Sequence, residues 1–316
     1  MNLKIYDILI IGGGPAGIFA ASLAKIKGLK PMLIEINNDL GGQPLLLYSE
    51  KNIEDYPGYV RIKSCELISN LIQQFKSLDI PLLLKTTILN CKLIKNIFHV
   101  NLNNKKNIKT KTIILATGPG IFIPTTLQIK GSNHPKVQYY VRNIDIYHNK
   151  KIIVLGGGDS AVDWANKLSQ ITKKITIIHR RDAFRALGNN VNNLKKNGVK
   201  ILLNYQILEI VNQSLVCKNN STQKIVKIPF DYIIVQYGQV FSKETFKFVR
   251  NLNVDKNNRI PVNAAQATNL SNIYAIGNVC TYEGKPSSII CAHGEAAVAV
   301  RDILNKLKPY DQSKPH

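Results

Sequence analysis

Acidic residues, paired cysteines and long apolar runs are what this sequence has least of. The chain of 316 residues carries 20 acidic residues against 42 basic ones, and its formal net charge is +22. The five cysteines are scattered, and the closest pair, Cys280 and Cys291, is eleven positions apart. This spacing excludes a CxxC redox motif and the usual zinc-ligand patterns, so we expect reduced interior cysteines and no metal site.

No apolar stretch approaches the roughly 20 residues that a membrane helix needs. The apolar run near the N-terminus is short and leads into a glycine loop, which does not match a signal peptide. Hydrophobic residues make up 45% of the chain and charged residues 20%, as in ordinary globular proteins. We therefore expect a cytoplasmic protein with no membrane contact, and the length predicts two domains.

The basic charge predicts acidic partners, namely phosphate-bearing cofactors, an acidic protein or nucleic acid. Only eight of the basic residues are arginine, and no run of five consecutive basic residues occurs. Arginine and aromatic residues do not alternate as they do in proteins that bind single strands. We expect no nucleic-acid partner, and an RNA-binding role is a remote alternative that only the charge supports.

A glycine-rich loop follows the first predicted strand. Residues 5–11, "IYDILII", form a continuous apolar run typical of a buried parallel strand. They lead into "GGGPAG", which matches G-x-G-x-x-G with Gly12, Gly14 and Gly17. The first glycine of this pattern permits a tight turn, the second lets backbone approach a pyrophosphate, and the third lets the helix pack on the strand.

A predicted helix over 16–28 and a strand over 31–35 complete this unit. Glu35 ends the strand 23 residues after Gly12, where a carboxylate can accept hydrogen bonds from both ribose hydroxyls. Strand, loop, helix, strand and acid in this order predict a dinucleotide site. The acidic end suits FAD, whose ribose carries no 2′-phosphate.

The same pattern recurs after residue 150. A strand over 151–155 leads into "GGGDSA", with Gly156 and Gly158 in the first two places and Ala161 in the third. A helix over 161–171 and a strand over 174–181 are predicted to follow.

Basic residues replace the acid at the end of this second strand. We align Arg180, 24 residues after Gly156, with Glu35, and Arg181 and Arg185 lie close to it in sequence. A carboxylate would repel a ribose 2′-phosphate, whereas guanidinium groups bind it bidentately. The second loop is therefore predicted to bind NADP rather than NAD. Two dinucleotide sites in one chain indicate hydride transfer from NADPH to FAD.

The remaining segments predict where the chain returns to the first domain. An alternating stretch ends in "ATG" at 116–118, and "PFDYIIVQYG" ends the second unit at 229–238. A strand in "NIYAIGN" and an amphipathic helix beginning near Gly294 follow, and the helix N-terminus is expected to face the flavin pyrimidine. We predict an α/β fold with two Rossmann-like three-layer dinucleotide-binding domains, the NADP domain being inserted into the FAD domain. The predicted boundaries are 1–116 and 242–316 for the FAD domain and 117–241 for the NADP domain.

The sequence resembles the thioredoxin reductase family of flavoproteins, and within it the ferredoxin/flavodoxin-NADP reductases. The stretches that carry the resemblance are "GGGPAG", "GGQ", "LYSEK", "ATG", "GGGDSAVDWA", "HRRDAFRA", "AIGNVCTYEGK" and "GEA". Thioredoxin reductases have a redox CxxC about twenty residues before the second glycine loop, where this sequence reads "VQYYVRNI". Disulfide relay through the protein needs paired thiols. The resemblance therefore implies an NADPH-dependent reductase that passes electrons through FAD to an acidic ferredoxin or flavodoxin, in a homodimer.

The resemblance also assigns roles to single residues. Tyr48 matches the tyrosine that stacks on the flavin, and an aromatic core residue is the alternative. Asn278 departs from the family's aspartate, although its amide oxygen remains an acceptor for the flavin ribityl chain. His293 is placed just before the last helix, either near the flavin or in an exposed loop. His316 and Tyr310 in the tail are candidates for a ring that covers the second flavin face.

Further positions are cofactor contacts by resemblance alone. On the FAD side they are Pro15, Ala16, Gly42, Gln43, Asp55, Ala116, Thr117, Gly118, Gly277, Glu295 and Ala296, and on the NADP side Asp159, Ser160 and His179.

Other activities of the same fold stay open. One is a low-molecular-weight disulfide reductase, although such enzymes have a cysteine where this chain has Ala16. Another is an NADPH oxidase. A non-catalytic redox sensor is a third, but a sensor would not need its own hydride donor site.

Overall fold

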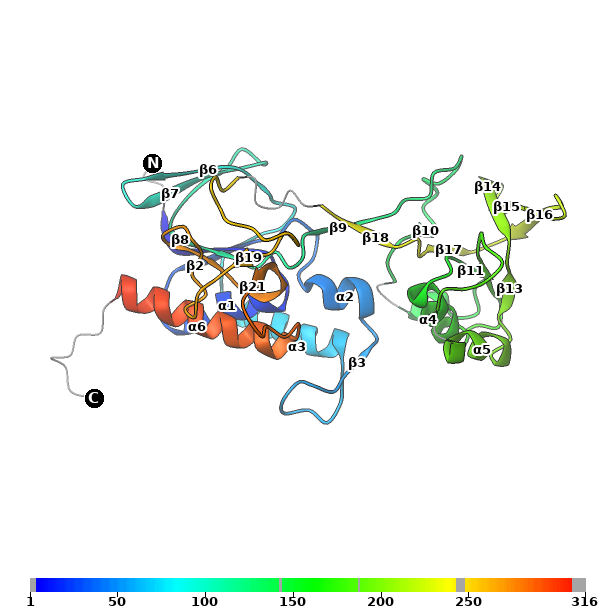
Figure 1. Ribbon diagram of the computed structural model, residues 1–316, viewed down its shortest axis with the longest axis horizontal. Helices are drawn as coiled ribbons and strands as arrows, with labels where there is room; N and C mark the ends of the chain where they lie inside the picture. The colour runs from blue at the N-terminus through cyan, green and yellow to red at the C-terminus, as the bar shows by residue number, and fades with distance from the viewer. Residues whose placement is uncertain (1–3, 142–143, 187, 243–247, 309–316) are drawn as a thin grey trace. The chain divides into compact units, whose positions relative to one another are not determined.

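Two parallel β-sheets organise the chain, one in each of two units. The protein is described from a computed structural model that covers residues 4–141, 144–186, 188–242 and 248–308. Unit 1 comprises Met1–Ile121 and Phe241–His316, and unit 2 comprises Phe122–Val240 (Figure 1). No helix within the described residues is both long and apolar enough to cross a bilayer.

The sheet of unit 1 has the order β5-β2-β1-β8-β7-β6, and β20 pairs with the last residues of β8, beyond those that pair with β7. Strands β5, β2, β1, β8 and β20 run parallel, whereas β6, β7 and β8 form an antiparallel meander. The strands are β1 (Ile5–Ile11), β2 (Pro31–Ile34), β5 (Leu82–Leu83), β6 (Ile88–Ile94), β7 (Ile97–Leu102), β8 (Asn107–Leu115) and β20 (Ile273–Ala275).

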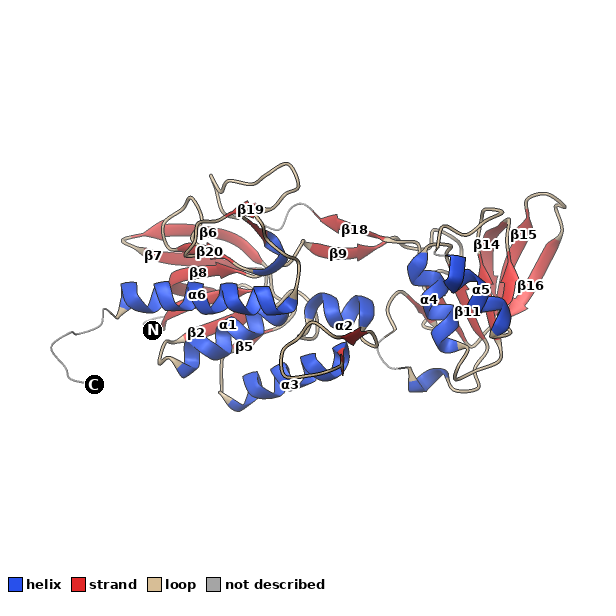
Figure 2. Cartoon of the chain, turned by 60° about the horizontal axis from the view of Figure 1, so that its bottom comes forward, coloured by secondary structure: helices blue, strands red, loops and turns tan. Residues whose placement is uncertain are grey.

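Helices cover one face of the parallel strands, and apolar side chains of the meander pack against the other face. Helices α1 (Pro15–Ile26), α3 (Ser64–Ser77) and α6 (Ile289–Leu307) lie along one face (Figure 2). Their apolar side chains form one core with alternate residues of β1, such as Ile8 and Ile10. The intervening residues of β1 pack with the apolar side chains of β7 and β8. Because both faces are covered, β1 reads as an unbroken apolar run.

Shorter elements complete unit 1 and lead to unit 2. They are α2 (Gly42–Tyr48), β3 (Asn52–Ile53), β4 (Ile62–Lys63), β19 (Ile260–Pro261), the 3₁₀ helix η2 (Gly277–Val279) and β21 (Cys280–Thr281). Strands β9 (Ile121–Pro124) and β18 (Gln239–Ser242) pair with each other where the chain passes from one unit to the other.

Unit 2 repeats the plan of unit 1. A parallel sheet, ordered β10-β17-β11-β12-β13, has helices α4 and α5 on one face and the antiparallel β14-β15-β16 sheet against the other. The elements are β10 (Val137–Gln138), η1 (Asp145–Tyr147), β11 (Ile152–Leu155), α4 (Asp159–Leu168), β12 (Ile175–Ile178), α5 (Gly188–Lys196), β13 (Lys200–Leu202), β14 (Tyr205–Val211), β15 (Ser214–Asn219), β16 (Ile225–Pro229) and β17 (Tyr232–Val235). The predicted α/β fold class is confirmed.

One predicted boundary is wrong. Helix α6 begins at Ile289 rather than near Gly294. Ser288 is its N-cap, and the hydroxyl oxygen accepts a hydrogen bond from the Cys291 amide. His293 therefore lies inside the helix, where it is 5% exposed, and not in a loop that precedes it.

The first glycine loop holds α1 close to β1. Gly12 has a φ of +110°, and a Cβ at Gly17 would lie 1.9 Å from the Gly12 carbonyl oxygen. The loop and the helix can approach this closely only because Gly17 has no side chain.

We expect Gly17→Ala to destabilise the protein by about 3 kcal/mol, because the methyl group would meet rigid backbone. Gly294→Ala is the matched control, since nothing lies within 4 Å of an added Cβ at this helical position. The control should raise stability by about 0.5–1 kcal/mol. Urea unfolding followed by circular dichroism measures both, and equal midpoints for the two variants would contradict the close-approach argument.

Candidate functional site

The carboxyl ends of the parallel strands of unit 1 meet at one edge. Gly12 follows β1, Glu35 follows β2, Ala116 follows β8 and Gly277 follows β20. Ligands of open α/β sheets bind outside the carboxyl ends of the strands. This edge is therefore the candidate site of unit 1.

The glycine loop leaves room at its centre. An added Cβ at Gly14 would have its nearest neighbour, the Gly42 Cα, 3.9 Å away. Gly14 is the N-cap of α1, and Pro15 occupies the first helical position, where a missing N–H is tolerated. The first amides of a helix have no partner within the helix, so this helix end suits an anion such as a pyrophosphate.

Glu35 is a buried acid, with only 5% of the residue exposed. Its Oε2 accepts a hydrogen bond from the Gly13 amide at 2.5 Å. Its Oε1 accepts from the Asn37 amide and from Asn37 Nδ2, at 2.8 and 2.7 Å. These neutral donors fix the carboxylate beside the glycine loop, where ribose hydroxyls would meet it.

Two further segments close around the loop. A Cβ at Gly42 would lie 2.8 Å from the Gly14 Cα, so the start of α2 packs on the loop. A Cβ at Gly277 would lie 3.1 Å from the Ala16 Cβ, so the η2 turn packs there too. Asn278 Nδ2 donates to Gln43 Oε1 at 3.2 Å and joins α2 to the turn.

Three other residues predicted on the FAD side differ in how deeply they are buried. Thr117 lies at the same edge between Ala116 and Gly118, and its buried Oγ1 has no hydrogen-bond partner in the structure. Tyr48 ends α2 half-buried, and burial raises its pKa above the usual value. Asp55 is exposed between β3 and β4. The orphaned Thr117 hydroxyl and the space at Gly14 both fit a bound dinucleotide.

Two predicted residues of α6, Glu295 and Ala296, lie in the interior of unit 1. The Glu295 carboxylate is buried and accepts hydrogen bonds from protein groups, the Gly277 amide among them. Ala296 has no exposed surface and packs in the helical core. The side chains of both face the interior of unit 1.

The second loop has the same close approach in unit 2. Gly156 has a φ of +149°, and an added Cβ would lie 2.5 Å from the Gln236 carbonyl oxygen and 2.9 Å from the Ala161 Cβ. Ala161 is fully buried and performs the packing role of Gly17. Gly158 has open space around it, and Asp159 and Ser160 form the exposed start of α4.

The alignment of Arg180 with Glu35 is wrong by one residue. The Gly12 amide donates to the Ile34 carbonyl, and the Gly156 amide donates to the Ile178 carbonyl. Glu35 and His179, which directly follow these two residues, therefore occupy equivalent positions. His179 is 7% exposed, and a Cβ at Gly157 would lie 2.3 Å from its ring. Burial, and then the three nearby arginines, lower its pKa, so His179 is neutral at this position.

The three arginines follow His179 on the surface. Arg180, Arg181 and Arg185 are exposed. The Arg185 amide donates to the Gly157 carbonyl at 2.7 Å, which ties the arginine segment to the glycine loop. The Arg181 carbonyl accepts from the Asn204 amide at 2.8 Å. The structure therefore gathers the three guanidinium groups at the end of β12, beside the second loop.

Comparison with known proteins identifies the family. The family model described as pyridine nucleotide-disulphide oxidoreductase matches residues 6–296. The chain belongs to this family. Membership confirms the predicted oxidoreductase class and implies FAD and NADP(H) as cofactors.

Individual relatives narrow the likeness. The chain is 40% identical to the ferredoxin-NADP reductase of Ligilactobacillus salivarius, over 97% of this chain and 93% of the relative. It is 39% identical to the ferredoxin-NADP reductase of Malacoplasma penetrans, over 98% and 99%. Among solved structures, Lactococcus lactis thioredoxin reductase aligns with a TM-score of 0.66 and 29% identity, over 95% of this chain and 98% of the other.

Sequence reasoning missed the middle glycine of both loops. A Cβ at Gly13 would lie 2.4 Å from Leu40 and 3.1 Å from Glu35 Oε2, and a Cβ at Gly157 would meet the His179 ring. The middle glycine therefore makes room for the residue that ends the second strand. The repeated "GGG" was the available signal, since the motif itself requires only the outer two.

His316 and Tyr310 lie outside the residues that the structure describes. Among the described residues, no group of three or more potential metal ligands occurs.

His293 joins helix α1 to the turn that carries Tyr56. Its ring stacks on Phe19 of α1 at a centroid distance of 4.7 Å, and its Nδ1 lies 3.1 Å from the Tyr56 hydroxyl. Burial lowers the pKa of His293 to about 4, so the ring is neutral.

This pKa predicts that acid destabilises the protein. Between pH 6.5 and 4 the unfolded chain binds a proton at this histidine and the folded chain does not, so stability falls as the pH drops through that range. The full effect is on the order of 3 kcal/mol. His293→Gln should flatten this part of the stability profile, measured by urea unfolding at pH 7, 6, 5 and 4.5. His148→Gln, at an exposed position, is the control. Identical profiles for the wild type and His293→Gln would refute the assignment.

Proposed function

We propose that this protein is an NADPH-dependent flavoprotein reductase that passes electrons from NADPH through FAD to a ferredoxin or flavodoxin. Two glycine loops of the same geometry, each at the carboxyl edge of a parallel sheet, support two nucleotides in one chain. The observation that carries the proposal is the difference in charge beside the loops. Glu35 faces the first, and neutral His179 with three exposed arginines faces the second.

The residues around each loop divide the binding tasks. In unit 1 the amides at Gly14 would hold the FAD pyrophosphate, Glu35 would accept from the ribose, and the Gly277–Asn278 turn would meet the flavin side. In unit 2 the arginines would hold the NADP 2′-phosphate, since guanidinium groups bind phosphate bidentately. When bound, FAD supplies the conversion between a two-electron hydride donor and one-electron carriers.

The acceptor follows from what the chain has and from its relatives. The sequence has no CxxC motif, so disulfide relay lacks its paired thiols. Ala16 stands in the glycine loop where a reactive cysteine would be needed for a small disulfide substrate. Two relatives near 40% identity are ferredoxin-NADP reductases. With a net charge of +22, the surface would attract an acidic carrier protein. A homodimer and a cytoplasmic location remain predictions.

Arginine substitutions test the NADP assignment. The variants are Arg180→Ala, Arg181→Ala and Arg185→Ala. Replacing an arginine that binds the phosphate should lower the ratio of kcat/KM with NADPH to kcat/KM with NADH by about 10- to 100-fold. The NADH value itself should hardly change, because NADH has no 2′-phosphate. An unchanged ratio in all three variants would sink the assignment.

Anaerobic spectroscopy tests the whole electron path. NADPH should bleach the flavin absorbance of the purified protein faster than NADH does. Ferredoxin or flavodoxin should then restore the colour, and the rate should fall as salt screens the charge attraction. Oxidised thioredoxin should not restore the flavin absorbance. Reoxidation by thioredoxin, or a protein that stays colourless when FAD is supplied, would overturn the proposed function.

A further inference from the structure

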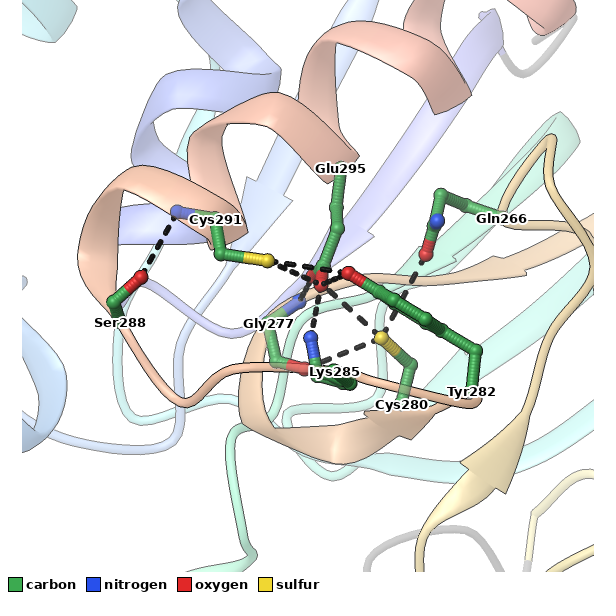
Figure 3. A network of polar contacts seen from close by, with 8 residues as sticks. All are labelled: Gln266, Gly277, Cys280, Tyr282, Lys285, Ser288, Cys291 and Glu295. Atoms are coloured by element: carbon green, nitrogen blue, oxygen red, sulfur yellow. Dashed lines mark hydrogen bonds and ion pairs between the residues drawn. The ribbon is translucent and has the colours of Figure 1, made fainter.

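Glu295 is a buried carboxylate surrounded by donors from one loop. It lies in the second turn of α6 with 4% of the residue exposed. Its Oε2 accepts from the Gly277 amide at 2.6 Å, and its Oε1 accepts from the Tyr282 hydroxyl at 2.9 Å. The Lys285 ammonium also binds Oε1 (Figure 3). Tyr282 and Lys285 belong to "CTYEGK", and Glu295 belongs to "GEA", so the structure joins two motifs that lie apart in sequence.

The charge of Glu295 is balanced inside the protein. The side chains of Lys285 and Glu295 are each 3% exposed. A buried carboxylate without a cation would be strongly disfavoured, and removing one partner of such a pair leaves the other charge unpaired. Lys285 therefore supplies the positive charge that balances the Glu295 carboxylate in the interior.

Two thiols complete the network as donors. Cys280 Sγ lies 3.5 Å from Glu295 Oε2, and Cys291 Sγ lies 3.3 Å from Oε1. Burial raises the pKa of Cys280 to about 12, so this thiol stays protonated. Cys291 also lies 3.1 Å from the Tyr282 hydroxyl. Both cysteines are free thiols, and Cys280 Sγ also lies 3.3 Å from the Gly277 carbonyl oxygen.

The network fixes a turn at the edge where the sheet of unit 1 holds its glycine loop. Gly277 has a φ of +73° and packs against Ala16, and Asn278 bonds to Gln43. The Gly277 amide would be buried without a partner if the Glu295 carboxylate were removed, which disfavours this shape of the turn.

We propose that Glu295 and Lys285 are positioning residues: the carboxylate holds the Gly277–Asn278 turn in the shape that receives FAD, and the lysine supplies the balancing charge, while neither touches the cofactor. This inference rests on the proposed function only in placing FAD at this edge. It assigns Glu295 to the turn rather than to the flavin itself.

Paired substitutions separate the effect of charge balance from the effect of the hydrogen-bond acceptor for the Gly277 N–H. E295Q/K285M removes both charges but keeps an amide oxygen for the Gly277 N–H. E295A/K285M also balances the charges but leaves this N–H without an acceptor. We expect the folded apoprotein of E295Q/K285M to bind FAD within about threefold of the wild-type Kd, and that of E295A/K285M to bind about 10- to 100-fold more weakly. The single variants E295Q and K285M should be the least stable, because each leaves a buried charge unpaired.

The readouts are the Kd for FAD by fluorescence titration, the visible circular dichroism of bound flavin, and urea unfolding of the apoproteins. D302N/K306M is the matched control, since Asp302 and Lys306 form an ion pair at 2.7 Å further along the same helix. It should leave the FAD affinity and the flavin spectrum unchanged. Equal FAD affinity in E295A/K285M and E295Q/K285M would overturn the positioning role.

That result is distinct from failure of the proposed function. The proposed function fails on the wild type, through its choice of electron acceptor or an inability to bind FAD. A wild type that binds no FAD would overturn this inference as well. If the wild type binds FAD but reduces a different acceptor, the comparison of the double variants still decides the role of Glu295.

Discussion

The close approach of backbone to backbone at the two glycine loops is the constraint on which both sites depend. At Gly17 of α1 an added Cβ would lie 1.9 Å from the Gly12 carbonyl oxygen, and at Gly156 an added Cβ would lie 2.9 Å from the Ala161 Cβ of α4. This contact sets each helix directly on its strand, so that the helix N-terminus faces the carboxyl edge of the sheet. The open space at Gly14 and Gly158 lies in the same loops. Packing and binding therefore require glycine for opposite reasons, contact in one place and clearance in the other.

The two units use one scaffold and differ in the residue that ends the second strand. Glu35 and His179 occupy equivalent places, each against the middle glycine of its loop. The carboxylate is satisfied by neutral amides, whereas the imidazole is kept neutral by burial and by adjacent guanidinium groups. The neutral imidazole removes the negative charge that the carboxylate supplies in unit 1, and Arg180, Arg181 and Arg185 supply positive charge beside it, while the fold is unchanged.

Helix α6 concentrates buried polar chemistry beside the first loop. His293 contacts Phe19 and Tyr56 on one side, and Glu295 is bound by the Gly277 amide and Lys285 on the other. Burial is tolerated because the histidine is neutral and the glutamate is paired. These contacts tie helix α1, the loop that carries Tyr56 and the loop over residues 277–285 to the first two turns of α6. The helix therefore positions the site as well as completing the core.

The sequence by itself determined the strands, the loops and the two-site plan, because apolar periodicity and glycine spacing are local signals. It also indicated the acid and the basic cluster at the ends of the second strands. Tertiary structure decided what depends on contacts between distant segments. Counting residues aligned Arg180 with Glu35, whereas backbone pairing of Gly156 with Ile178 selects His179. Likewise, only the folded chain brings Lys285 and Gly277 to Glu295, since no local pattern records which buried charge will find which partner.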